Sequence, residues 1–294
     1  MPTKIEWTDK TWNPTTGCTK VGPGCANCFI VRTPPFYYNR RKFERVGTEM
    51  TTGVILHPER LEHPLKWRKP QRIFVNSLSD LFHEDVPDEF IDQVFAVMAL
   101  APQHTFQILT KRPERMVQWF AYSQAFRTRA DRVSEALADW YGLDHEAYDP
   151  TSIWPFSNVH LYVSVENQYW ADKRLPFLMQ TPAAVRGVSY EPALKRVELS
   201  DYLDAGYESG GPQGWIPQPS LDHIIIGGES GPRARPFDIE WARSTVAQCK
   251  VAGVAVFVKQ MGSVWAKENG IKNDPKGGNM QHWPEDLRIR QSPE

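Results

Sequence analysis

The chain has 294 residues, of which 41% are hydrophobic and 23% charged, a composition typical of a folded globular protein and not of a disordered one. Its 34 Lys and Arg nearly balance its 35 Asp and Glu, which excludes bulk attraction to nucleic acid or anionic membranes but not a local basic patch. No apolar run reaches the roughly 18 residues of a membrane span, and the N-terminus lacks a signal peptide's apolar core. We therefore expect a cytoplasmic protein with no membrane partner.

Short apolar runs that end in polar residues are typical of buried parallel strands followed by functional loops. We expect one such strand near Trp12 and six more at residues 72–75, 105–109, 159–163, 184–188, 223–226 and 254–258. Helical spacing of apolar residues predicts helices over 88–100 and 237–251. Strands that alternate with helices predict an α/β fold, and six or seven such units favour an incomplete TIM-like barrel.

Two stretches differ from this alternating pattern. Residues 117–156 are longer than a crossover requires, which predicts a helical insertion. Residues 204–220 are rich in Gly and Pro and predict a long loop. Neither resembles an interdomain linker, so we expect a single domain over 1–294.

The strongest chemical signal is a cysteine loop at about residues 12–30, with Cys18, Cys25 and Cys28 in the spacing C-x6-C-x2-C. Cytosolic thiols stay reduced, so these cysteines are better explained as metal ligands than as disulfides. Three thiolates without an obvious fourth ligand favour a [4Fe–4S] cluster with one open iron. Zinc, which prefers a fourth Cys or His, is the alternative. Cys249 lies in a predicted helix and is expected in the core.

Several segments together resemble a known family. They are residues 5–18, 24–28, 79–82, 109–113, 227–231 and 283–288. These segments look like those of the phage Gp37/Gp68 family, a three-cysteine-motif group related to radical SAM enzymes. The resemblance covers nearly the whole chain and implies a partial TIM-like barrel, a [4Fe–4S] cluster and S-adenosylmethionine (SAM). In such enzymes the cluster passes an electron to SAM, and the resulting 5′-deoxyadenosyl radical abstracts hydrogen from a substrate.

Two features differ from the wider radical SAM pattern. The first cysteine gap is three residues longer than in C-x3-C-x2-C. The Gly-Gly-Glu motif, which usually follows the second strand and contacts SAM, here occurs four strands later as Gly227, Gly228 and Glu229. This late motif is therefore expected to bind either SAM or the substrate.

Polar residues at the predicted strand ends are the candidates for cofactor binding and catalysis. The cofactor-binding candidates are Asn76, Ser77, Ser164, Glu166, Gly227, Gly228, Glu229 and Ser230. The candidates for positioning a substrate or moving a proton are Lys111, Glu191 and Lys259. Solvated strand ends, a tight turn and structural ion pairs are the alternative explanations for these residues.

Basic and aromatic residues are interleaved in two stretches, 32–45 and 66–72. Cations for phosphates and rings for stacked bases suit a single-stranded or flipped-out nucleotide. The alternative is a solvated helix face whose aromatic residues pack inward.

The sequence therefore predicts a radical SAM-like enzyme that depends on an external electron donor. A nucleic acid base is the candidate substrate, in modification or in photoproduct repair. The alternatives are a zinc-stabilised nucleic-acid-binding module without catalysis and a cluster protein that only carries electrons.

Overall fold

The computed structural model describes residue 3 and residues 5–120, 155–204, 206–209 and 215–293. The chain divides into two compact units. Unit 1 comprises residues 1–161 and 181–184, and unit 2 comprises residues 162–180 and 185–294. The sequence predicts a single domain over 1–294. The division into two units does not test this assignment, which stays a prediction.

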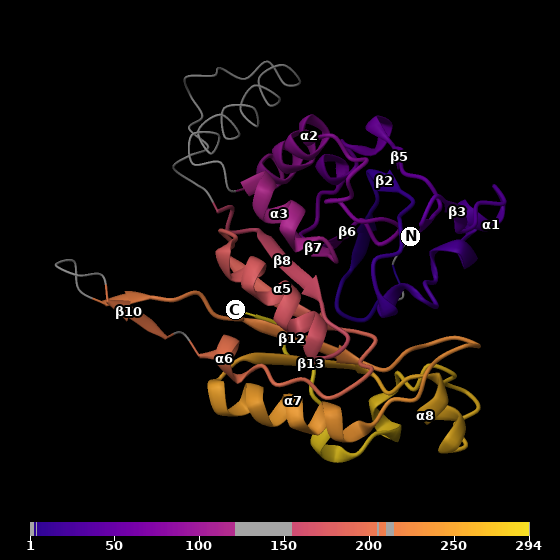
Figure 1. The fold of residues 1–294 in the computed structure, drawn as a ribbon, viewed down its shortest axis with the longest axis vertical. Helices are drawn as coiled ribbons and strands as arrows, with labels where there is room; N and C mark the ends of the chain where they lie inside the picture. Colours follow the sequence, from indigo (N-terminus) through magenta and orange to yellow (C-terminus); the bar gives the residue numbers. More distant parts are fainter. Residues whose placement is uncertain (1–2, 4, 121–154, 205, 210–214, 294) are drawn as a thin grey trace. The chain divides into compact units, whose positions relative to one another are not determined.

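All seven predicted strands are present, and five of them end one or two residues later than expected. They are β1 (Lys10–Trp12), β6 (Arg72–Val75), β7 (Thr105–Thr110), β8 (Val159–Ser164), β9 (Val185–Tyr190), β12 (His223–Gly227) and β13 (Ala255–Gln260). They form one seven-stranded sheet in chain order, with β1 and β13 at its edges, and the registered pairs are parallel (Figure 1). The predicted α/β class is therefore confirmed, and the open parallel sheet is consistent with a partial barrel.

In unit 1, helices follow β6 and β7, and the first of them agrees with the helix predicted over 88–100. They are α2 (Asp88–Ala99) and α3 (Pro113–Phe120). The apolar stripe of α2, formed by Ile91, Val94, Phe95 and Met98, is buried. The ring of Phe95 stacks on that of Trp119 in α3 at 4.4 Å between centroids, so the two helices share a core.

The other helices and strands in the described part of unit 1 are short and lie near the cysteine loop or just after it. They are β2 (Thr15–Thr16), α1 (Pro34–Tyr37), β3 (Glu44–Val46), β4 (Glu49–Thr51) and β5 (Ile55–Leu56), with 3₁₀ turns η1 (Pro23–Cys25), η2 (Ile30–Arg32), η3 (Pro58–Arg60) and η4 (Pro64–Lys66). The strand β2 pairs with β5, and β3 pairs with β4 in an antiparallel hairpin.

Unit 2 contains the helices that accompany the later strands. They are α5 (Gln168–Gln180), α6 (Ser200–Leu203), α7 (Ile239–Ala252) and α8 (Ser263–Glu268), with 3₁₀ turns η8 (Met280–His282) and η9 (Glu285–Leu287). Asp238 caps α7 by accepting a hydrogen bond from the Glu240 amide, and Gly253 ends the helix at a φ of 72°. Cys249 is fully buried in α7, as predicted for a core residue.

The predicted loop at 204–220 is wrong in part. It contains an antiparallel hairpin of β10 (Tyr207–Ser209) and β11 (Trp215–Pro217). Each strand has only three residues, too few for a period-two pattern to be recognised within a Gly-rich and Pro-rich stretch. The predicted insertion at 117–156 begins within α3, and its residues 121–154 lie outside the described residues. In the described parts of the chain, no helix is both long and apolar enough to cross a membrane.

Candidate cysteine-loop site

The cysteine loop follows β1. Just before the first cysteine, Gly17 holds the loop against two other segments of the chain. The amide of Gly17 donates a hydrogen bond to the Leu78 carbonyl at 2.9 Å. Gly17 has a φ of 101°, and a Cβ at this position would lie only 1.7 Å from the Gly53 carbonyl oxygen. Only glycine therefore allows the chain to pass between these two segments just before the first cysteine.

The backbone of Cys18 is held by the segment around Thr52. The Cys18 amide donates to Thr52 Oγ1 at 2.9 Å, and the Thr52 amide donates to the Cys18 carbonyl at 3.1 Å. One residue further on, Thr19 forms a bridge with Thr51. The backbone position of Cys18 is thus set by residues that follow the cysteine loop in sequence.

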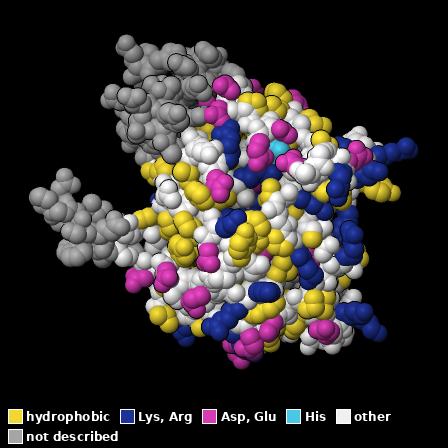
Figure 2. Space-filling model, viewed as in Figure 1, with side chains coloured by type: hydrophobic (Ala, Val, Ile, Leu, Met, Phe, Trp, Pro, Cys, Tyr) yellow, Lys and Arg dark blue, Asp and Glu magenta, His cyan; other side chains and the backbone are white. Residues whose placement is uncertain are grey.

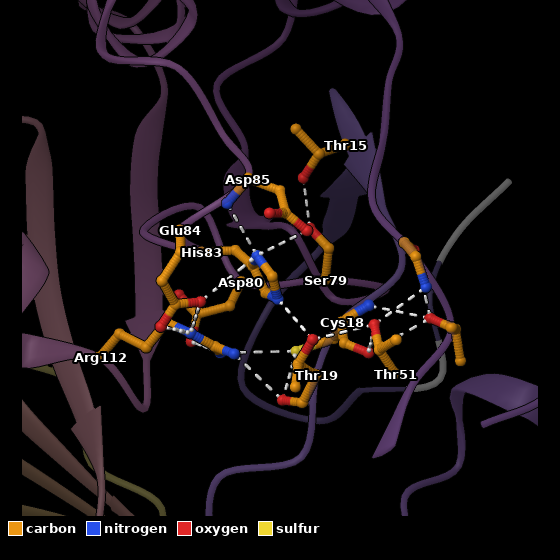
Figure 3. Close-up of polar contacts among 12 residues, drawn as sticks. Thr15, Cys18, Thr19, Thr51, Ser79, Asp80, His83, Glu84, Asp85 and Arg112 are labelled. Atoms are coloured by element: carbon orange, nitrogen blue, oxygen red, sulfur yellow. Dashed lines mark hydrogen bonds and ion pairs between the residues drawn. The ribbon is translucent and has the colours of Figure 1, made fainter. Parts of the chain in front are cut away.

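The side chain of Cys18 faces the guanidinium group of Arg112 (Figure 3). Arg112 Nη1 donates to Cys18 Sγ at 3.6 Å, and Nη2 donates to the Thr19 carbonyl at 3.1 Å. The same guanidinium group contacts Asp80 at 3.4 Å and Glu84 at 2.9 Å. Arg112 is only 6% exposed, so its charge is balanced by these two carboxylates and not by water.

Asp80 joins the two strand-end segments that carry the family resemblance. Its carboxylate accepts hydrogen bonds from Thr110 Oγ1 at 2.7 Å and from the Lys111 amide at 2.9 Å. It also accepts one from the Phe82 amide at 3.1 Å. Residues 79–82 and 109–113 therefore converge on Cys18. No local pattern in the sequence pairs Asp80 with Arg112, because the two residues lie 32 positions apart after different strands.

A second chain of hydrogen bonds reaches the loop from His83, which is 2% exposed. His83 Nδ1 accepts from the Asp85 amide at 3.1 Å, so Nε2 carries the proton and donates to Thr19 Oγ1 at 2.9 Å. Thr19 Oγ1 in turn donates to Thr51 Oγ1 at 2.9 Å. Burial lowers the pKa of His83, and the Arg112 charge lowers it further, which favours this neutral form.

The three thiols of the loop interact electrostatically. Burial raises the pKa of Cys18 to about 12; Arg112 lowers it, while Asp80 and Cys25 raise it. Burial also raises the pKa of Cys28, against the Ile30 amide, which lowers it. The charge of Cys25 raises the pKa of Cys28 as well, and the charges of Lys111 and Lys20 lower it. Cations and an amide donor thus face sulfurs that would carry negative charge as ligands.

The chemistry of this donor set fits an iron–sulfur cluster. All three cysteines are free thiols on one loop, and their neighbours are the cations and N–H donors that stabilise cluster sulfurs. In the described part of the chain, however, no three His, Cys, Asp or Glu side chains are gathered closely enough to hold a metal ion. Cluster binding therefore stays a prediction.

The candidates Asn76 and Ser77, which follow β6, lie in the same unit as the cysteines. Asn76 Oδ1 accepts from the Thr15 amide at 3.3 Å, and Asn76 adopts a φ of 60°. Ser77 Oγ donates to Asn13 Oδ1 at 3.2 Å. Both side chains thus brace the segment that leads from β1 into the cysteine loop.

The acidic candidates of unit 2 each contact a cation. Glu166, which is fully buried, contacts Arg174 at 3.0 Å. Glu229 contacts Arg235 at 2.7 Å, and it also accepts from the Arg235 amide. The candidates Glu191 and Lys259 form an ion pair at 2.6 Å. The pair of Glu191 and Lys259 agrees with the structural ion pair that is the alternative explanation for those two residues. The alternative for Glu166 is a solvated strand end, which does not agree with its burial.

The positions of the other unit 2 candidates depend mainly on contacts of their backbone. A Cβ on Gly228 would lie 2.4 Å from the Met261 carbonyl oxygen, so the glycine permits close contact with the end of β13. Gly227 has ordinary space, with its nearest neighbour at 3.4 Å. Ser164 is buried at the end of β8, where its carbonyl accepts from Arg174 Nη1 at 2.8 Å. Ser230 is partly exposed in the loop after β12.

The fold places the protein among α/β proteins built on a parallel sheet, with a cysteine loop at its N-terminal end. Residues 2–285 match the model of the family described as "Protein of unknown function (DUF5131)", and the chain belongs to this family. No curated protein and no solved structure matches the chain.

Proposed function

We propose that this protein is a radical SAM-like enzyme that holds a [4Fe–4S] cluster on Cys18, Cys25 and Cys28. The observation that carries the proposal is the arrangement of three free thiols on one loop whose first sulfur accepts a hydrogen bond from a buried arginine. When bound, such a cluster supplies the electron that cleaves SAM reductively. The resemblance to the phage three-cysteine family supports the same function.

The protein's own residues have distinct roles in this proposal. Arg112 orients the Cys18 sulfur and offsets negative charge on it. Lys111 places a second positive charge near Cys28, as its effect on the pKa of that thiol indicates. Asn76 and Ser77 are our candidates for contacting SAM within the same unit, because they follow β6 next to the loop segment.

The test is anaerobic reconstitution of the full chain with iron and sulfide, followed by metal analysis. We expect about four irons per chain and the visible absorbance of a cluster. With dithionite and SAM added, we expect release of 5′-deoxyadenosine. Cys18→Ser, Cys25→Ser and Cys28→Ser should each lower the iron content. Cys249→Ala should not, because Cys249 lies in the core of α7.

Two outcomes contradict the proposal. A colourless protein that carries zinc would favour the metal-stabilised binding module. A reconstituted cluster that never cleaves SAM would favour a protein that only carries electrons.

A further inference from the structure

A basic and aromatic arm, residues 34–51, extends from the cysteine loop. It comprises α1 and the β3–β4 hairpin, and most of its residues are exposed. Its four Arg and Lys exceed its two Glu, although the whole chain has a net charge of −1. On the face drawn in Figure 2, Lys and Arg side chains gather where α1 and β3 lie, with hydrophobic side chains among them.

Two of the four aromatic side chains of the arm are largely exposed, whereas Phe36 is fully buried and Phe43 is partly buried. Tyr37 is 70% exposed and Tyr38 is 78% exposed, and their rings lie edge to face at 5.6 Å between centroids. Phe29, directly after Cys28, is 49% exposed. Within the stretch 32–45, Phe36 packs inward, as the alternative explanation expects, whereas Tyr37 and Tyr38 face solvent.

The cations beside these rings are equally accessible. Arg40 and Arg45 are exposed, and within the described residues their side chains have no ion pair or hydrogen bond. Lys42 reaches Glu44 only at 4.0 Å, with both side chains largely in solvent. Such charges are available for an anionic partner.

The arm is built onto the cysteine loop. The Lys20 amide donates to the Met50 carbonyl at 2.9 Å, and Lys20 Nζ lies over the Phe43 ring at 4.7 Å. Arg41 lies over Phe36 and donates to Thr16 and to the Gly53 carbonyl. A ligand bound along the arm would therefore be held next to the cysteine loop.

The second basic stretch, 66–72, is different because internal partners engage most of it. Lys66 contacts Glu62 at 3.5 Å, and Arg72 contacts Asp9 at 2.9 Å. The Trp67 ring is covered by Lys10 at 4.2 Å. Lys66, Arg68 and Lys69 are exposed there, but the aromatic ring beside them, Trp67, is partly buried.

We propose that the arm binds single-stranded nucleic acid, with Tyr37 and Tyr38 stacking on bases and Arg40 and Arg45 contacting phosphates. Unpaired bases are needed because a duplex hides the base faces on which these rings would stack. The inference deepens the proposed function by naming the substrate class, but binding is measurable without a cluster.

The test is fluorescence anisotropy of the full chain with labelled oligo-dT and oligo-U of about 16 nucleotides, at several salt concentrations. We expect Arg40→Glu/Arg45→Glu to weaken binding at least about tenfold, and to reduce the slope of log affinity against log salt by roughly 0.7 for each phosphate that the variant no longer neutralises. Tyr37→Ala/Tyr38→Ala should weaken binding about tenfold, because the variant cannot stack on bases. A dA·dT duplex of the same length should bind more weakly than oligo-dT.

The matched control is Arg68→Glu/Lys69→Glu, which makes the same change in net charge on the other basic stretch. It should alter affinity by less than about threefold, because Arg68 and Lys69 have no exposed aromatic ring beside them on which a base could stack. Equal losses of affinity in the two charge-reversal variants would overturn the proposal. It would also be overturned if the tyrosine variant bound like the parent protein, the result expected if the arm binds an anionic protein. Iron content is measured in parallel, so loss of binding and loss of the cluster are distinguished.

Discussion

At Cys18, the backbone and the sulfur are held by different parts of unit 1. Thr52 holds the backbone through two hydrogen bonds, and Arg112 approaches the sulfur from the end of β7. Arg112 also joins Asp80 and Glu84, so the position of its guanidinium group is set by carboxylates on a separate loop. A residue placed in this way can orient a ligand sulfur without becoming a ligand itself.

Replacing Arg112 should therefore be costly even in protein without a cluster. Arg112→Gln leaves the carboxylate of Asp80 buried without its counter-charge, and we expect a loss of about 3 kcal/mol or more in the free energy of unfolding. The measurement is urea denaturation followed by tryptophan fluorescence.

Arg115→Gln is the control for this change. Arg115 pairs with Asp88 in the same unit, but the two side chains are 23% and 28% exposed. We expect a loss of about 1 kcal/mol or less, since water compensates a partly exposed charge. Equal losses in the two variants would show that Arg112 and Asp80 are not a buried pair in solution.

At the scale of elements, local sequence signals account for where the helix α7 begins and ends. The helix α7 shows this at both ends, with Asp238 as its N-cap and Gly253 in the left-handed region beyond its last turn. A Cβ added to Gly253 would meet open space, so any effect of substitution there comes from the backbone alone.

We expect Gly253→Ala to lower the free energy of unfolding by about 1–2 kcal/mol, because alanine is disfavoured at positive φ. Denaturation curves measured by circular dichroism test this expectation. Lys250→Ala, in the exposed last turn of the same helix, should change stability by about 0.5 kcal/mol or less. A Gly253→Ala protein as stable as the parent would contradict the left-handed cap.

For the whole molecule, a bound cluster would act as a ligand of the folded state. The unfolded chain cannot gather Cys18, Cys25 and Cys28 around one centre, so binding stabilises the fold by mass action. We expect anaerobic reconstitution to raise the melting temperature by about 5 °C or more, as measured by calorimetry.

Cys25→Ser is the control for this shift, because it removes one thiol of the loop. The reconstituted variant should melt at nearly the same temperature as its cluster-free form. Chelation of iron should return the parent protein to its lower melting temperature. If iron and sulfide did not change the melting temperature of the parent protein, the result would argue against a cluster in this loop.

The sequence by itself determined the seven strands of the main sheet, the helices α2 and α7, and the cysteine loop, because these depend on the periodicity and spacing of residues close together in the chain. It missed the hairpin at 207–217, whose strands are too short to show a period. It also identified the arm as basic and aromatic, but not which of its rings face solvent.

Only the tertiary structure decided what surrounds Cys18. Arg112 lies 94 residues from Cys18 in the chain, and no local pattern can encode a contact at that separation. The contact arises because the parallel strands β6 and β7 end at the same edge of the sheet and bring their polar loops together. The tertiary structure likewise decided that Glu166, Glu229 and Glu191 form ion pairs. It also decided that the arm, unlike the second basic stretch, carries largely exposed aromatic rings.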